Sequence, residues 1–254
     1  MIHAIQQVLR FELERAITRG RIAMWTAIAI FPALLMFLMQ TQVQGRLPAE
    51  PLVIMATYLV AQFGCMLGLL LWATPAVGAE LEAQTWTYLA LRPQGRIALV
   101  LGKYLVAVAF SISSGLISSL GVAFFSRYQD VWTLAAVLCA LVVISSLCYG
   151  ALYLLIGIVW SKRATVFAVV YSLIIEGAIS YVPAAINKLT VCYRIQSLLA
   201  EWSGLVRLQE NRERLVGSEP VWQHLTGVAL FVTLCLVVSI VVVQNKEFPG
   251  QGED

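Results

Sequence analysis

Five long stretches without a charged side chain dominate this sequence. They run between Arg21 and Arg46 and over residues 51–79, 104–126, 131–161 and 220–245. Each exceeds the ~20 residues that an α-helix needs to cross the ~30 Å hydrocarbon core of a bilayer. Lipid offers no hydrogen bonds to the backbone, so only helices and closed barrels cross it, and the sequence lacks the ~10-residue alternating segments of barrel strands. The pattern therefore predicts an all-α polytopic membrane protein.

The composition points the same way. Of the 254 residues, 60% are hydrophobic and 12% are charged, whereas soluble domains carry roughly 25% charge. A water-facing surface would have to be built of apolar side chains, and such a protein would aggregate. The net charge is only +3, and the basic residues are scattered or lie beside the apolar stretches, which argues against a nucleic-acid partner.

We expect one transmembrane domain over residues 1–254 with six spans. A sixth segment has the length of a span but contains Glu176. The predicted spans are 22–40, 52–73, 97–125, 132–160, 164–183 and 221–243. Apolar residues recur at helical spacing in residues 1–21, which predicts an interfacial helix before the first span.

Lysine and arginine in the short loops predict the orientation. One side holds Arg10, Arg15, Arg19, Arg21, Arg92, Arg96, Lys103, Lys162, Arg163 and Lys246, whereas the short loops of the other hold only Arg46 and Arg127. Both termini are therefore expected in the cytoplasm, with the chain in the cytoplasmic (inner) membrane. The connector 184–219 must then lie outside, although it carries several basic residues, because long loops follow the rule less strictly.

The external connector has a pattern of its own. Ile195, Leu198, Leu199, Trp202, Leu205 and Val206 repeat with helical spacing. An amphipathic helix on the outer membrane surface explains this stripe best. A short re-entrant hairpin around Pro183 is the alternative.

The sequence contains no constellation for catalysis. His3 and His224 lie near opposite ends of the chain, so they are not expected to share a metal ion or to activate a serine. The nearest string to a P-loop, Gly95 to Lys103, has the wrong spacing. We therefore expect no catalytic site and no metal site, and we expect the many serines of the third span to serve helix packing.

Glu176 is the one ionisable side chain placed inside a predicted span. It lies ~18 Å along the fifth span at 1.5 Å per residue, just past the membrane midplane. A charge at this depth costs ~2.5–3.5 kcal/mol on insertion scales, so such residues usually face a cavity or a partner. Two roles are equally compatible with this position: a polar group lining a translocation path, or a hydrogen bond that orients the fifth span or the loop after it.

Residues 79–96 form the most informative connector. Glu80 and Glu82 stand in a first helical turn, where the helix dipole favours acids. Leu81, Thr85, Tyr88 and Leu89 share one face, with Trp86 beside it. Pro93 then biases Arg92 toward extended geometry. The pattern predicts a helix over 79–93 lying under the membrane, with Arg96 and Lys103 as interfacial anchors. Docking of a cytoplasmic partner is the favoured role, and simple contact with lipid headgroups is the alternative.

This connector resembles the coupling region of the membrane subunits of ABC-2-type transporters. The matching residues are Glu80, Glu82, Thr85, Leu89, Arg92, Pro93, Gly95, Arg96, Gly102 and Lys103. The resemblance implies a permease without a cofactor of its own, two copies of which form a twelve-span pore. ATP and magnesium would then belong to a separate cytoplasmic ATPase. An extracytoplasmic accessory protein is a further partner compatible with this architecture.

The resemblance also implies roles for single residues. Glu80, Glu82, Thr85, Trp86, Leu89 and Arg92 are expected to dock the ATPase. Glu176 and Pro183 are expected to line or gate the pathway of an exporter. Two other classes stay open: an ion-coupled secondary transporter or channel that uses Glu176, and a membrane scaffold or intramembrane enzyme. Drugs, peptides, lipids and envelope cargo are all compatible with the architecture.

Overall fold

The computed structural model describes residues 12–13, 17–42, 48–76, 78, 80, 95–178, 190–205, 208–210 and 220–245. Within these residues all regular secondary structure is helical, which confirms the all-helical prediction for this part of the chain. Five of the helices are long and apolar enough to cross a membrane. Each of the five overlaps one of the predicted spans.

The long helices have the following bounds. They are α2 (Arg19–Gln42), the continuous rod of α3 (Ala49–Thr57), η1 (Tyr58–Gly64) and α4 (Cys65–Trp72), then α7 (Gly95–Phe125), α8 (Val131–Val159) and α12 (Val221–Asn245). The shorter elements are η2 (Ser161–Arg163), α9 (Ala164–Tyr171), η3 (Ser172–Ala178) and α10 (Val191–Trp202). Both η1 and η3 are π-helical.

Parts of three predicted segments lie outside the described residues. The fifth span, 164–183, is described as far as Ala178, so the count of six spans stays a prediction. Of the predicted coupling helix 79–93 only Glu80 is described. Of the predicted interfacial helix 1–21 the structure describes residues 12–13 and 17–21, and α2 already begins at Arg19.

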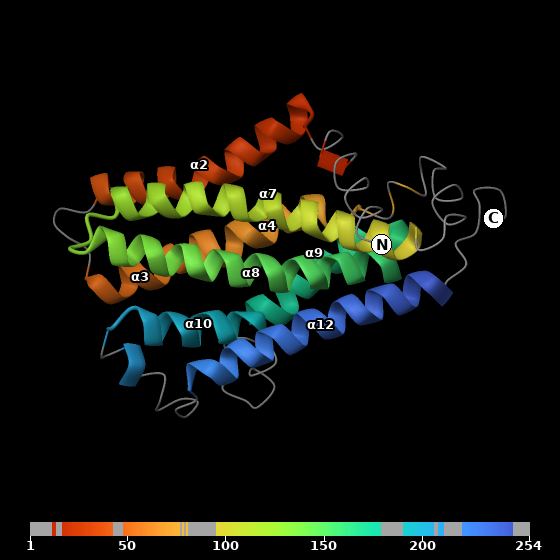
Figure 1. The fold of residues 1–254 in the computed structure, drawn as a ribbon. Helices are drawn as coiled ribbons and strands as arrows, with labels where there is room; N and C mark the ends of the chain where they lie inside the picture. The colour runs from red at the N-terminus through yellow and green to blue at the C-terminus, as the bar shows by residue number, and fades with distance from the viewer. Residues whose placement is uncertain are drawn as a thin grey trace.

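The helices α7 and α8 form the centre of the bundle (Figure 1). On one side, α2 packs along α7 and α4 contacts both central helices, whereas α10 and α12 pack against α8. Small residues allow the close approach of α7 and α8: a Cβ atom at Gly115 would lie 2.5 Å from Cγ1 of Val142. The hydroxyls of Ser111 and Ser146 join the same two helices at 2.9 Å, which is the packing role expected of the serines.

The helix α10 packs beside α8 and α12 (Figure 1). Its residues Ile195, Leu198 and Leu199 are almost completely buried and belong to the main hydrophobic core. The stripe therefore packs against neighbouring helices, and the choice between a helix on the outer membrane surface and a re-entrant hairpin stays a prediction, because Pro183 lies outside the described residues. An amphipathic stripe alone does not tell lipid from the apolar face of a neighbouring helix, because both are equally apolar.

The outward faces of the bundle are strongly apolar. Phe124 on α7, Leu173 on η3 and Leu230 on α12 are 75%, 68% and 70% exposed. In water a surface of this kind would aggregate, whereas against lipid acyl chains it costs nothing. The apolar exterior and the long helices together make this a membrane-embedded protein.

Candidate functional site

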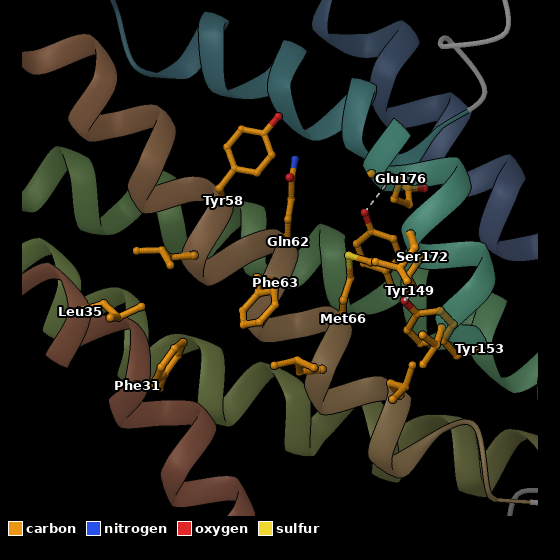
Figure 2. Close-up of a pocket in the computed structure, with 16 residues that line it drawn as sticks. Phe31, Leu35, Tyr58, Gln62, Phe63, Met66, Tyr149, Tyr153, Ser172 and Glu176 are labelled. Atoms are coloured by element: carbon orange, nitrogen blue, oxygen red, sulfur yellow. Dashed lines mark hydrogen bonds between the residues drawn. The ribbon is translucent and has the colours of Figure 1, made fainter. Parts of the chain in front are cut away.

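A cavity of about 630 Å³ opens between α2, the α3–η1–α4 rod, α8 and the α9–η3 segment. Figure 2 shows the 16 residues that line it, with Phe31 on α2, Phe63 on η1 and Tyr149 on α8 facing the space from different helices. Phe31 and Gln62 lie near the middle of the candidate spans Arg19–Gln42 and Ala49–Trp72. The cavity therefore lies at about half the depth of the bundle.

Both π-helical segments of the structure line this one cavity. Tyr58, Gln62 and Phe63 come from η1, and Ser172, Glu176 and Gly177 come from η3. A π-helical turn holds one residue more than an α-helical turn, so it widens the helix and redirects the side chains after it. Such turns occur frequently at functional sites. The side chains of η1 and η3 are thereby turned toward a shared space.

Four groups of the described residues donate hydrogen bonds to the carboxylate of Glu176. The hydroxyls of Tyr149 and Tyr171 donate at 3.0 and 3.3 Å. The backbone N–H groups of Val191 and Cys192 donate at 3.2 and 2.9 Å. Since these two N–H groups belong to the first turn of α10, the carboxylate satisfies orphan donors at the positive end of the helix dipole. The hydrogen-bonding role considered above is present in this geometry.

The helix α10 also contacts η1, the other π-helical segment. The amide of Gln62 donates to the sulfur of Cys192 at 3.1 Å, and the amide of Gln196 donates to the hydroxyl of Tyr58. One face of α10 thus binds η1, and its N-terminus binds η3 through Glu176. A displacement of α10 would therefore act on both π-helical segments and on the cavity between them.

The lining is mostly apolar and aromatic, with few polar groups. The aromatic members are Phe31, Tyr58, Phe63, Tyr149 and Tyr153. The rings of Phe31 and Phe63 lie 6.3 Å apart, and those of Tyr149 and Tyr153 stack at 6.0 Å. This combination, a large apolar surface with a small number of convergent polar groups, is typical of sites for small organic molecules.

Glu80 lies apart from the cavity and is 2% exposed. Its carboxylate lies 2.9 Å from the ammonium of Lys103, which also lies 2.9 Å from the carboxylate of Glu12. Lys103, predicted as an interfacial anchor, is itself 5% exposed. These three charges join the N-terminal segment, the beginning of the connector and α7, and the docking role of Glu80 stays a prediction.

Of the other residues predicted as anchors, docking residues or gate residues, the structure describes Arg96. Arg96 donates to the carbonyls of Val243 and Gln244 at 3.3 and 2.8 Å. It therefore binds the negative end of α12, as basic groups do at helix C-termini. The remaining predicted docking and gate residues lie outside the described residues. They are Glu82, Thr85, Trp86, Leu89, Arg92 and Pro183.

Sequence reasoning missed most of the cavity lining. Tyr149 and Tyr153 stand four residues apart on one face of α8, and Gln62 is an uncharged polar residue within an apolar stretch. Polar side chains inside spans were a usable signal, because they seek partners away from lipid. Which of them share a cavity depends on how distant segments pack.

The described metal-ligating side chains do not gather into a group of three or more that could hold a metal ion.

A bundle of long apolar helices around an amphipathic cavity at half its depth defines a membrane transport protein. Residues 18–177, more than half of the chain, match the model of a protein family described as ABC-2 family transporter protein. The chain belongs to this family and is an ABC-2-type permease. None of the curated proteins compared with it matches.

Proposed function

We propose that this permease is the membrane subunit of an ATP-driven exporter, with the cavity between η1 and η3 as part of the translocation pathway. The observation that carries the proposal is the position of this cavity at half the depth of the bundle in an ABC-2-type chain. A substrate at this depth can reach either side after a modest helix movement. Two π-helical walls support such movement, because irregular helices rearrange more easily than regular ones.

A second copy of the chain completes the pathway in this proposal. The cavity is open on one side, where Phe31, Phe63 and Leu173 are 43%, 48% and 68% exposed. These side chains come from three different helices and give the opening an apolar rim. Pairing of two such rims about a two-fold axis would enclose the space between the copies. The assembly would then have twelve spans, as the resemblance implies.

A separate ATPase drives the cycle in this proposal, since the sequence contains no P-loop. The segment 79–93 would dock it through Glu82, Thr85, Trp86, Leu89 and Arg92. The buried contacts of Lys103 with Glu80 and Glu12 support force transmission, because they join the beginning of that segment directly to α7. Both termini and the connector 79–93 would face the cytoplasm in the inner membrane.

Co-purification with an ABC ATPase from the same genome tests the proposal. The chain and the ATPase would be co-expressed and reconstituted in nanodiscs, and complex yield and ATP hydrolysis measured. We expect Trp86→Ala/Arg92→Glu to abolish the complex. Trp132→Ala is the matched control, because Trp132 is 81% exposed and stands at the beginning of α8, at the end of the bundle predicted to face away from the ATPase. A folded, monodisperse chain that binds no ATPase would overturn the proposal.

The ion-coupled alternative makes a different prediction. It requires that Glu176 exchange protons or ions during transport. The four described donors around its carboxyl group, two of them backbone N–H groups, hold this group in place and favour a positioning role instead. Transport in proteoliposomes driven by a pH or sodium gradient, without ATPase and lost in Glu176→Gln, would support the alternative.

A further inference from the structure

The cavity has a charge character as well as a shape. Its described lining contains no lysine, arginine or histidine, and its one carboxyl group is that of Glu176. An anionic group brought into this space would leave water without meeting a basic partner, which is costly in an apolar site. A neutral molecule avoids that penalty, and a cation offsets part of its own desolvation cost against the carboxyl group of Glu176 and the faces of the aromatic rings.

The aromatic residues favour a cation over a neutral molecule. Phe31 and Phe63 approach each other at the rim, and Tyr149 and Tyr153 form a stacked pair on α8 (Figure 2). The faces of such rings carry partial negative charge and attract a cation within about 6 Å of the ring centre, most strongly where water is excluded. Quaternary ammonium and similar diffuse cations are recognised in this way, and they lose less hydration than a compact ammonium.

The volume of the cavity limits the size of the molecules that it can bind. A volume of about 630 Å³ suits a drug-sized molecule and lies within the ~300–1,000 Å³ of small-molecule sites. The apolar rim, which includes Leu35 and Leu67, would contact the hydrocarbon part of such a molecule. Gln62 and Ser172 offer polar contacts toward the interior.

From the lining we infer that the cavity binds lipophilic monovalent cations, that is, drug-sized molecules with one diffuse positive charge and a large apolar surface. This inference rests on the proposed function for its meaning as a substrate class. The binding itself needs neither ATP nor the partner ATPase, so the purified chain is sufficient to test it.

Two probes of nearly equal shape and opposite charge separate the charge effect from the apolar effect. Tetraphenylphosphonium is the cation and tetraphenylborate the anion, and each would be measured alone with the chain in nanodiscs. Thermal stability is recorded against probe concentration, and empty nanodiscs correct for partitioning into lipid. We expect a saturable rise in the unfolding temperature with the cation and none with the anion. Equal saturable effects of both probes, or none with the cation, would overturn the inference.

Variants assign the binding to the cavity. Phe63→Leu keeps an apolar side chain but removes the aromatic face, and we expect about three- to tenfold weaker binding of the cation. Phe124→Leu is the matched control, because Phe124 is 75% exposed on α7 and does not line the cavity. Equal affinities in the two variants would contradict the assignment.

A reversal of charge gives an independent readout. Leu67→Lys places a positive charge at the rim, where Leu67 is 37% exposed. We expect it to abolish binding of the cation and to permit binding of tetraphenylborate. Leu120→Lys, at a 53% exposed position outside the lining, should retain the preference of the unmodified chain. A Leu67→Lys protein that still prefers the cation would contradict the inference.

The two proposals fail separately. Loss of the ATPase complex together with intact cation binding would overturn the exporter function and leave the binding site. An active ATPase complex without cation binding would overturn the substrate class and leave the permease. Transport of the cation by the complete complex is the result that joins them.

Discussion

The ammonium group of Lys103 lies 2.9 Å from a carboxylate oxygen of Glu80, and both side chains are almost completely buried. The carboxylate of Glu12 lies at the same distance on the ammonium. One positive charge on α7 thus holds together two acidic residues that are 68 positions apart (80 − 12) in the sequence. Removal of the Lys103 ammonium group would leave two buried carboxylates close together. Breaking a buried ion pair by removing one partner is strongly destabilising.

We therefore expect Lys103→Met to lower the stability of the protein by about 3–5 kcal/mol. The triple variant Lys103→Met/Glu12→Gln/Glu80→Gln should recover much of this loss, because it also neutralises the two carboxylates that Lys103 contacts. Apparent unfolding temperatures in one detergent measure both effects. Lys162→Met, at an exposed position, controls for the loss of a lysine. A triple variant no more stable than the single one would show that charge pairing is not the cause.

Glu176→Gln tests the positioning role of this side chain. A glutamine offers one acceptor oxygen and turns an NH₂ group toward donors, so at least one hydrogen bond from Val191 or Cys192 should be lost. An unsatisfied buried donor costs about 1–3 kcal/mol. We expect hydrogen exchange in a peptide covering the first turns of α10 to be roughly tenfold faster.

Glu201→Gln is the control for the same helix. Glu201 stands in the last turn of α10 and is exposed, so its replacement should leave exchange in the first turns unchanged. Identical exchange in the Glu176→Gln and Glu201→Gln proteins would contradict a positioning role for Glu176.

Gly157→Ala tests the contact between the end of α8 and the turn after α4. A Cβ atom at Gly157 would lie 3.2 Å from the backbone carbonyl carbon of Thr74 and would overlap its oxygen. Because the obstacle is backbone, it has no rotamer to move into, and overpacking of this kind costs about 1–3 kcal/mol. Gly20→Ala has nothing within 4 Å of the new methyl group and should be neutral or slightly stabilising. Equal unfolding temperatures of the two variants would contradict this contact.

Asp130, the N-cap residue of α8, is expected to make the stability of the fold depend on pH. The hydroxyl and the backbone N–H of Thr133 donate to its carboxylate at 2.5 and 3.1 Å, and these hydrogen bonds hold the pKa of Asp130 below its ordinary value. A depressed pKa in the folded state stabilises the fold at neutral pH, and this contribution is lost as the pH falls through the folded pKa.

Asp130→Asn separates this effect from all other carboxylates. Asparagine still accepts a hydrogen bond as an N-cap but does not titrate. The unmodified chain should lose more thermal stability than the variant between pH 7 and pH 3, so that the difference between them shrinks on acidification. A difference that is constant with pH would mean that Asp130 does not contribute through its charge.

The span pattern was predictable because each helix satisfies its own backbone in lipid. The stretch between Arg21 and Arg46 contains α2 except for its first residues, and 131–161 contains α8. Helix formation there depends on residues close together in the sequence and on the solvent. The need of Glu176 for hydrogen-bond partners was also predictable locally, since a carboxyl group inside an apolar stretch is costly without them.

The position of α10 was not predictable in the same way. Its stripe of Ile195, Leu198 and Leu199 is compatible with the membrane surface and with the side of α8. In the structure it packs against α8. No local pattern in the sequence marked η1 or η3 as π-helical either. Both features depend on contacts between segments that are far apart, such as Gln62 with Cys192.

The sequence by itself determined that this is a helical membrane protein, roughly where five of its spans lie and that Glu176 is an acidic residue within a further apolar segment. Only the tertiary structure decided that Glu176 caps α10, that Lys103 is buried between two carboxylates and that two π-helical segments share a cavity. The physical reason is the reach of each interaction. Hydrophobicity selects the lipid phase residue by residue, whereas hydrogen bonds, ion pairs and cavities require partners that only the packed bundle brings within a few ångströms.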